Sequence, residues 1–183
     1  TLTPYFPYER KREALEDIKR LAFAELNIKV VVKCHPKERD DGLYEKIFGK
    51  DTYGDKWIYS NHHPFVLGSK CKFAIAFYSG VAIDMLAIGV PIIERLDIRG
   101  LNIPENYYVP NIGKDGHPVL SYRYLGLVLG ASNYEQLEFY AKEIVSDRRE
   151  TLNSLLSVYK EKFKINENAA NEIAKDIFSV IHL

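Results

Sequence analysis

The segment 73–96 constrains the fold more than any other part of the chain. It reads FAIAFYSGVAIDMLAIGVPIIERL, in which two apolar runs, 73–78 and 90–96, flank a Ser-Gly turn and a short apolar helix. Gly89 lies just past the expected end of that helix, where glycine commonly stops helices. Strand, helix and strand in this order are typical of a βαβ unit with parallel strands. The segment therefore predicts an α/β fold, and we expect 73–78 to be a central strand.

The flanking sequence continues the alternation of helices and strands. Residues 9–26 carry apolar side chains at helical spacing, and the β-branched run 28–32 suits a strand covered on both faces. The region 97–122 is rich in Pro and Gly and is expected to be a long loop. Further strands are expected at 2–6, 57–60 and 124–129, and further helices at 43–48 and 149–163, from Ser132 onward and at 167–181. We predict a doubly wound, Rossmann-like parallel sheet with helices on both faces and helices at the C-terminal end, in one domain spanning 1–183.

Composition excludes several classes of protein. The chain has 183 residues, 46% of them apolar, with 13 Tyr and 9 Phe, which is enough for a folded core and argues against disorder. Its 25 basic and 25 acidic residues give no net field to attract nucleic acid. We find no apolar run of about 18 residues and no secretory leader, so we expect a cytoplasmic chain without a transmembrane segment.

Two polar segments follow expected strands, and ligands of parallel sheets bind beyond the carboxyl ends of strands. The first contains Lys33 and His35. A histidine there can contact a phosphate or act as an acid, and the lysine adds positive charge. The alternative is a histidine that is satisfied by a backbone carbonyl in a turn, and the residues alone leave both readings open.

The second segment contains Ser79, Gly80 and Asp84. The unpaired amides at the start of a helix, with a glycine that permits close approach, can bind phosphate oxygens. Asp84 interrupts an apolar helix one turn later, where it could meet a ligand hydroxyl. Alternatively, Ser79 caps the helix and Asp84 pairs with a neighbouring residue. A nucleophilic serine is disfavoured because the G-x-S-x-G pattern is absent.

The adjacent pair His62 and His63 could suggest a metal, but neighbours in sequence rarely converge on one ion and no acidic residue lies nearby. We therefore expect no metal site and interpret the pair as part of a turn or of the first turn of a helix.

With these segments in view, the chain resembles the C-terminal half of GT-B-fold transferases that build bacterial capsule, teichoic acid and related surface polymers. TLTPYF resembles the strand that opens their second Rossmann-like domain, and KVVVKCHPKE resembles their K-x-HP signature. AFYSGVAIDMLAIGVPII is similar to the D-Y-S-S-x-x-x-D…G-x-P stretch of CDP-glycerol glycerophosphotransferases. It is also similar to the Ser-Gly turn of UDP-N-acetylglucosamine 2-epimerases. The resemblance spans about residues 1–96.

The resemblance implies roles for individual residues. His35 would be the catalytic residue that contacts the donor phosphate, Ser79 and Gly80 would hold the pyrophosphate, and Asp84 would hold a donor hydroxyl. Two positions depart from the pattern: Phe77 replaces an acidic residue, and Gly80 replaces the second serine of the glycerophosphotransferases. Residues 83–85 also lack the paired glutamates of the epimerases.

The resemblance further implies that the partners are a CDP-, CMP- or UDP-linked donor and an N-terminal acceptor domain outside this chain. No other cofactor is expected. The full-length protein would work in the cytoplasm, with peripheral association at the inner face of the membrane as a further expectation. The alternatives are a UDP-sugar 2-epimerase-like domain and a non-catalytic Rossmann-like domain used for binding or assembly.

Overall fold

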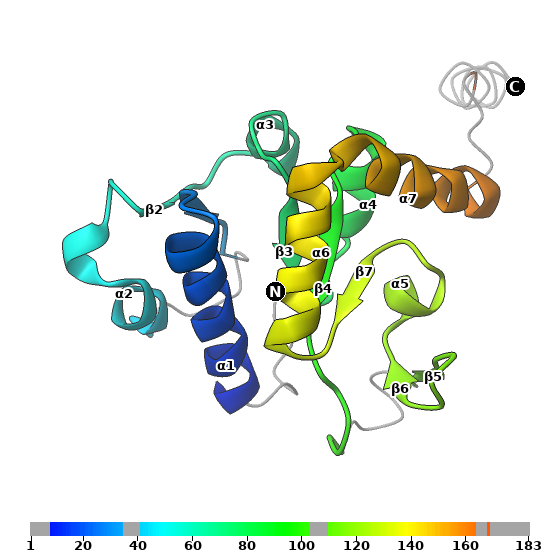
Figure 1. Cartoon of the computed structure of the whole chain (residues 1–183), viewed down its shortest axis with the longest axis horizontal. Coiled ribbons are helices and arrows are strands. Elements are labelled where there is room, and N and C mark those ends of the chain that lie inside the picture. Colours follow the sequence, from blue (N-terminus) through cyan, green and yellow to red (C-terminus); the bar gives the residue numbers. More distant parts are fainter. Residues whose placement is uncertain (1–7, 35–40, 103–109, 164–167, 169–183) are drawn as a thin grey trace, which may run out of the picture.

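A computed structural model describes residues 8–34, 41–102, 110–163 and 168 of the chain. The strand expected at 2–6, the helix expected at 167–181 and the candidate His35 lie outside the described residues. The described part combines helices with small parallel sheets, as an α/β fold requires (Figure 1).

The larger parallel sheet has three strands in the order β3-β4-β7. These are β3 (Ala74–Ala76), β4 (Ile92–Arg95) and β7 (Leu129–Ala131). All four residues of β4 are buried, whereas those of β3 are only partly covered. The expectation that 73–78 forms a central strand is therefore wrong for this sheet: the central strand is β4, because it is paired on both sides. The strand expected at 124–129 begins later, since α5 (Ser121–Tyr124) occupies the preceding residues.

Two further sheets are smaller. β1 (Val30–Val32) and β2 (Trp57–Tyr59) form a parallel pair, as the β-branched run and the run at 57–60 predicted. β5 (Asn111–Ile112) and β6 (Pro118–Val119) form an antiparallel pair inside the region expected to be a loop. Among the described residues, no strand pairing joins the β1–β2 sheet to β3–β4–β7.

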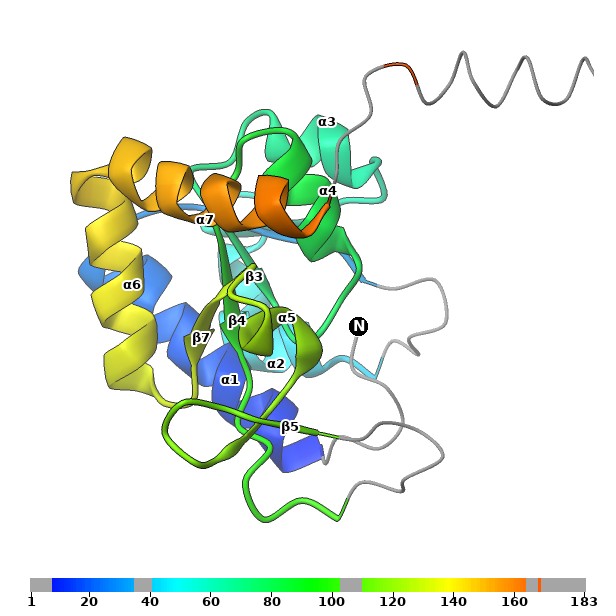
Figure 2. The same ribbon diagram turned by 90° about the vertical axis from the view of Figure 1, so that its right-hand side faces the viewer.

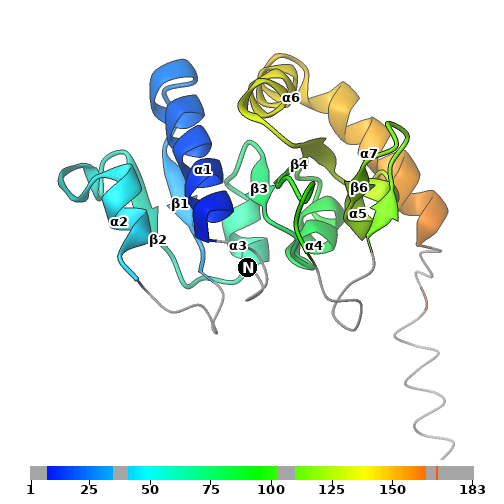
Figure 3. The same cartoon turned by 90° about the horizontal axis from the view of Figure 1, so that it is seen from below.

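Helices cover the three-stranded sheet from both sides (Figures 1 and 3). The alternation of side chains along β4 explains this arrangement, because successive residues of a strand face opposite sides. The four helices that cover the sheet are α1 (Tyr8–Lys19), α4 (Val81–Ala87), α6 (Tyr134–Ser146) and α7 (Arg148–Lys162). Ile93 joins the core cluster beneath α1 and α6, and Ile92 joins the cluster beneath α4 and α7. The remaining helical elements are the π-helical η1 (Arg20–Glu25), α2 (Leu43–Phe48), the 3-10 turn η2 (Lys50–Thr52) and α3 (Pro64–Gly68).

Two helix starts show how local sequence sets these bounds. Asn133 caps α6, because its side chain accepts a hydrogen bond from the Gln136 amide at 3.0 Å. The Gln136 side chain in turn accepts from the Ser132 amide at 2.7 Å, so the cap lies one residue later than expected. His63 caps α3 by accepting from the Phe65 amide at 3.3 Å, which agrees with its interpretation as a residue of the helix start.

The β1–β2 sheet and β4 share one hydrophobic cluster. Val32 and Trp57 pack in it together with Ile93, Leu15 of α1 and Leu137 of α6. Trp57 is fully buried, and its indole N–H donates to the Gly49 carbonyl at 2.7 Å. The cluster therefore joins the two parallel sheets through side chains rather than through backbone pairing.

This packing predicts unequal effects of two substitutions in α6. Leu137→Ala should lower the free energy of unfolding by about 2 to 5 kcal/mol, because Leu137 is 0% exposed and truncation leaves a cavity. Phe139→Ala is the control: Phe139 is 60% exposed, and its loss should change stability by no more than about 0.5 kcal/mol. Urea denaturation measures both values, and equal losses would contradict the assigned orientation of α6.

Candidate functional site

The Ser79–Gly80 turn lies directly beyond the carboxyl end of β3 and opens α4. Tyr78, which precedes it, has a φ of 74°, a conformation that is uncommon for residues other than glycine and is often found at functional sites. The Ser79 hydroxyl accepts a hydrogen bond from the Val81 amide at 3.3 Å, so the serine partly caps the helix. Gly80 is exposed to solvent. The turn is thus accessible to a ligand, as its proposed role requires.

The backbone of Gly80 does not itself require glycine. Its φ of −56° and ψ of −21° are ordinary helical values. Among the described residues, a Cβ added at this position would meet the Tyr122 hydroxyl alone, at an ordinary contact distance of 3.8 Å. The Tyr122 ring also lies 5.6 Å from the Tyr78 ring, centroid to centroid. The turn is therefore bordered by two tyrosines, and a glycine here permits close approach of another molecule.

Asp84 lies one helical turn beyond Gly80 and is half-buried. Its carboxylate makes no hydrogen bond or ion pair with any residue in the described ranges. The described residues therefore provide no partner for Asp84, as the alternative of a neutralising neighbour would require. Because α4 has only seven residues, it offers no long helix dipole, and the amides of its first turn already donate to Ser79 and Gly80. The amides with no acceptor among the described residues are those of Ser79 and Gly80 themselves.

The other candidates follow β1. Lys33 is exposed one residue beyond that strand. Cys34, next to Lys33, and Phe77, next to β3, pack against the same core cluster. His35 lies outside the described residues, so its expected approach to Ser79 stays a prediction.

Sequence reasoning missed a buried pair of charges beside the turn. Glu94 is 1% exposed, and its Oε1 accepts a hydrogen bond from Arg123 Nε at 3.1 Å. The remaining Arg123 nitrogens donate to the Ser132 hydroxyl at 2.9 Å and to the carbonyls of Glu94 and Leu96 at 3.0 and 2.9 Å. Arg123 packs across Gly130, where an added Cβ would clash with its side chain. Arg123 therefore ties its helix α5, which Figure 2 shows next to β4 and β7, to the carboxyl ends of these two strands.

A second buried charge at the end of β4 faces the opposite side of the sheet. Arg95 donates twice to Asp17 Oδ2 of α1, at 2.6 and 2.9 Å, and once to the Ser132 carbonyl at 3.0 Å. This pair is partly shielded from solvent and fixes α1 against β4. We interpret it as structural, since Arg95 has no free donor directed at the turn.

The strand register brings the Glu94–Arg123 pair to the same sheet edge as the Ser79–Gly80 turn. Ala76, the last residue of β3, is the register partner of Glu94. Arg123 also follows Tyr122 directly in sequence. One available signal for this pair was the appearance of two charged residues, Glu94 and Arg95, at the end of an otherwise apolar strand.

Burial changes the protonation of Glu94. It raises the pKa of the carboxyl group from 4.5 to about 7, and the neighbouring Arg123 only partly offsets the rise. Glu94 Oε2 has no hydrogen-bond partner among the described residues. The carboxyl group can therefore gain or lose a proton near neutral pH at the edge of the sheet where the turn lies.

No family model and no curated protein matches the sequence. The described helices are each too short or too polar to cross a lipid bilayer. Within the same part of the chain, no three His, Cys, Asp or Glu side chains are grouped as metal ligands would be.

The raised pKa of Glu94 predicts that the stability of the protein depends on pH. Below about pH 4.5 the carboxyl group is protonated in both the folded and the unfolded chain; as pH rises toward 7, the unfolded chain ionises first. The contribution of Glu94 to stability is therefore lost as pH rises, by about 3 kcal/mol in total.

Glu94→Gln removes the titrating group and should remove this dependence. In urea denaturation between pH 5 and 8, the wild-type stability should fall relative to that of the variant as pH rises. Using the difference between the two proteins cancels the titration of all other groups. A difference that stays constant over this range would show that Glu94 does not titrate there.

Proposed function

We propose that the chain is the nucleotide-donor-binding unit of a glycosyl- or glycerophosphoryltransferase of surface-polysaccharide biosynthesis. The observation that supports this most directly is the exposed Ser79–Gly80 turn at the carboxyl end of a parallel strand. Ligands of open parallel sheets bind at this edge, and backbone amides at a helix start are suited to phosphate oxygens.

The proposed fold is a doubly wound sheet. If β1 lies beside β3, the five parallel strands follow the order β2-β1-β3-β4-β7, and the chain changes direction between β1 and β3. Such a switch point is where ligands bind in sheets of this kind. Lys33 and the Ser79–Gly80 turn follow these two strands, so the proposed order and the proposed site support each other.

In this proposal the amides of Ser79 and Gly80 take the donor pyrophosphate. The unpartnered carboxylate of Asp84 takes a hydroxyl of the donor, while Lys33 and His35 neutralise charge on the leaving phosphate. Rate enhancement comes from positioning and from electrostatic stabilisation of that phosphate, with no metal required. The acceptor is held by a further domain outside this chain, and the reaction takes place in the cytoplasm or at the inner face of the membrane.

A titration with CDP, CMP, UDP and GDP tests the proposed role of Gly80. Gly80→Ala should leave stability unchanged or raise it by up to about 1 kcal/mol, because its backbone is helical and the new methyl group has room. The same methyl group should block close approach of phosphate and weaken nucleotide binding at least about tenfold. Calorimetry and the shift in melting temperature measure these two effects.

Ala87→Ser is the control for Gly80→Ala, since it adds one heavy atom at the exposed far end of α4. It should keep wild-type affinity. If no nucleotide binds the wild-type chain, the non-catalytic alternative is favoured. If Gly80→Ala binds like the wild type, the turn is not the phosphate site.

A pair of histidine variants tests the role implied for His35. His35→Ala should weaken binding of the preferred nucleotide about tenfold, because a charged hydrogen bond to phosphate is lost. His62→Ala should have no effect, since His62 is exposed and follows β2 rather than β1. Calorimetry at pH 6 and 8 makes the comparison, and equal affinities of the two variants would remove His35 from the site.

A further inference from the structure

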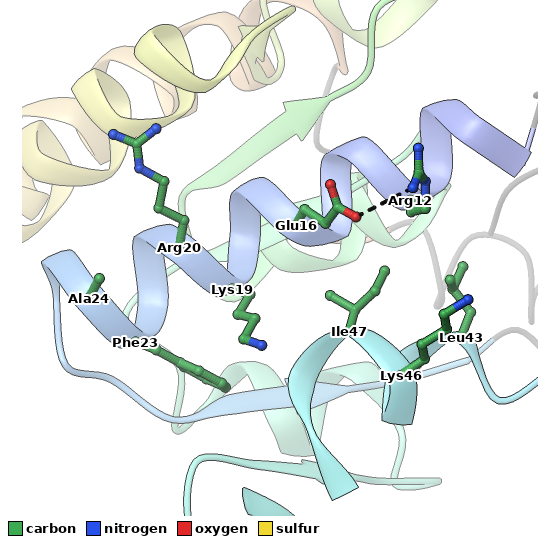
Figure 4. A pocket seen from close by; sticks show the side chains of 9 residues that line it. All are labelled: Arg12, Glu16, Lys19, Arg20, Phe23, Ala24, Leu43, Lys46 and Ile47. Carbon is green, nitrogen blue, oxygen red and sulfur yellow. Dashed lines mark ion pairs between the residues drawn. The ribbon is translucent and has the colours of Figure 1, made fainter.

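A groove between α1 and α2 lies apart from the Ser79–Gly80 turn and has a volume of about 510 Å³ (Figure 4). This volume falls within the range of about 300 to 1,000 Å³ that small-molecule sites occupy. Phe23 and Ala24 come from η1, and Leu43 and Ile47 from α2. The groove is thus apolar in its interior, and a π-helical turn, a form often found at functional sites, builds one end of it.

The charges around the groove are unequal. Four cationic residues line it against one acidic residue, Glu16. Glu16 pairs with Arg12 across one helical turn at 3.9 Å, so its charge is already matched. The Arg20 guanidinium lies 3.7 Å from the centre of the Tyr134 ring, and Figure 4 shows it directed away from α2. The charges that are left over belong to Lys19 and Lys46.

Lys19 and Lys46 line the groove from opposite helices. Figure 4 shows Lys19 and Phe23 projecting from the same side of the first helix toward α2, which carries Lys46. Neither lysine makes an ion pair with a residue in the described ranges. In Figure 4 the two ammonium groups lie on either side of Ile47, so the rim of the apolar groove carries unmatched positive charge that attracts an anion.

We infer that this groove binds a small amphiphilic anion, a molecule with one phosphate or carboxylate group and an apolar body. The anionic group lies at the cationic rim that Lys19 and Lys46 form, and the apolar body lies on Phe23, Leu43 and Ile47. A flat membrane surface fits less well, because the apolar residues line a hollow rather than protrude. The groove offers no histidine, cysteine or serine, so the inference concerns binding and not chemistry. It does not depend on the proposed transferase function.

Decyl phosphate, used below its micelle concentration, is the probe for the full chain. Amide chemical shifts in two-dimensional NMR should change in a saturable way at residues 19–24 and 43–47. Inorganic phosphate lacks the apolar body and should bind at least about tenfold more weakly. Decyltrimethylammonium has the opposite charge and should not bind there. Shifts centred elsewhere, or equal binding of either comparison compound, would overturn the inference.

Lys19→Gln/Lys46→Gln should weaken decyl phosphate binding about fivefold to tenfold, since it removes the half-buried cation Lys19 and the exposed cation Lys46. Lys70→Gln/Lys160→Gln makes the same charge change at exposed positions outside the groove and should keep wild-type affinity. Ala24→Glu, at an exposed position of the groove, places a carboxylate there and should also weaken binding. Circular dichroism confirms that each variant is folded. Wild-type affinity in both groove variants, or binding of an acidic peptide without binding of decyl phosphate, would contradict the assignment.

Because the proposed nucleotide site consists of residues 78–84 with Lys33 and His35, and none of these lines the groove, the two sites can fail independently. If the chain binds decyl phosphate but no nucleotide, the inference about the groove is supported and the proposed function is contradicted. If the chain binds nucleotide but no decyl phosphate, the reverse holds.

Discussion

The arginine at position 123 holds the carboxyl edge of the three-stranded sheet together. Its guanidinium donates to the Glu94 side chain, to the Ser132 hydroxyl and to two backbone carbonyls, so one side chain connects α5, β4 and the residue after β7. A buried carboxylate is costly unless it is paired, and removing one partner leaves the other uncompensated. Gly130 is part of the same arrangement, because only glycine leaves room for the arginine beside β7. The position of Tyr122, and with it one border of the Ser79–Gly80 turn, depends on this pair.

The buried Glu94–Arg123 pair at the sheet edge and the accessible Ser79–Gly80 turn have complementary roles. A binding site needs accessible backbone amides, but those amides must be held in place by elements that do not move. Here the accessible part is short, Ser79 and Gly80, while Glu94 at the same edge of the sheet is one of the most buried polar residues in the described chain. The left-handed Tyr78 turns the chain out of β3, and its ring packs near Leu96, Ile98 and Leu120. Packing of this residue can offset the strain of its backbone.

How far the sequence predicted the structure depends on the range of the interactions involved. Periodicity and turn residues predicted α1, β1, β2, α4 and α7 closely, because each depends on residues near in sequence. They did not predict which strand is central in the three-stranded sheet, since this depends on pairing between β4 and β7, more than thirty residues apart. Likewise, the Ser79–Gly80 turn was visible as a local motif, whereas Glu94 and Arg123 are 29 residues apart and meet only through the fold. Glu94 and Arg95 at the end of the apolar run 90–93 were a signal of this pair, but a search for local motifs does not detect it.

The net charge of the sequence likewise does not predict where charged side chains meet in the folded protein. The chain has equal numbers of acidic and basic residues, which argues against a global field but does not restrict local ones. Pairing decides where charge remains: Arg95 and Arg123 are matched inside the protein, and Arg12 is matched by Glu16 along one helix. The same accounting leaves Lys19 and Lys46 on an apolar groove, and Asp84 beyond the turn, without an ion-pair partner among the described residues. Lys19 and Asp84 are half-buried, and an unmatched charge that is partly shielded from water gains more from an external ion than a fully hydrated one, because fewer water contacts must be replaced. The distribution of partners, rather than the sum of charges, therefore directs attention to these two separate places on one small protein.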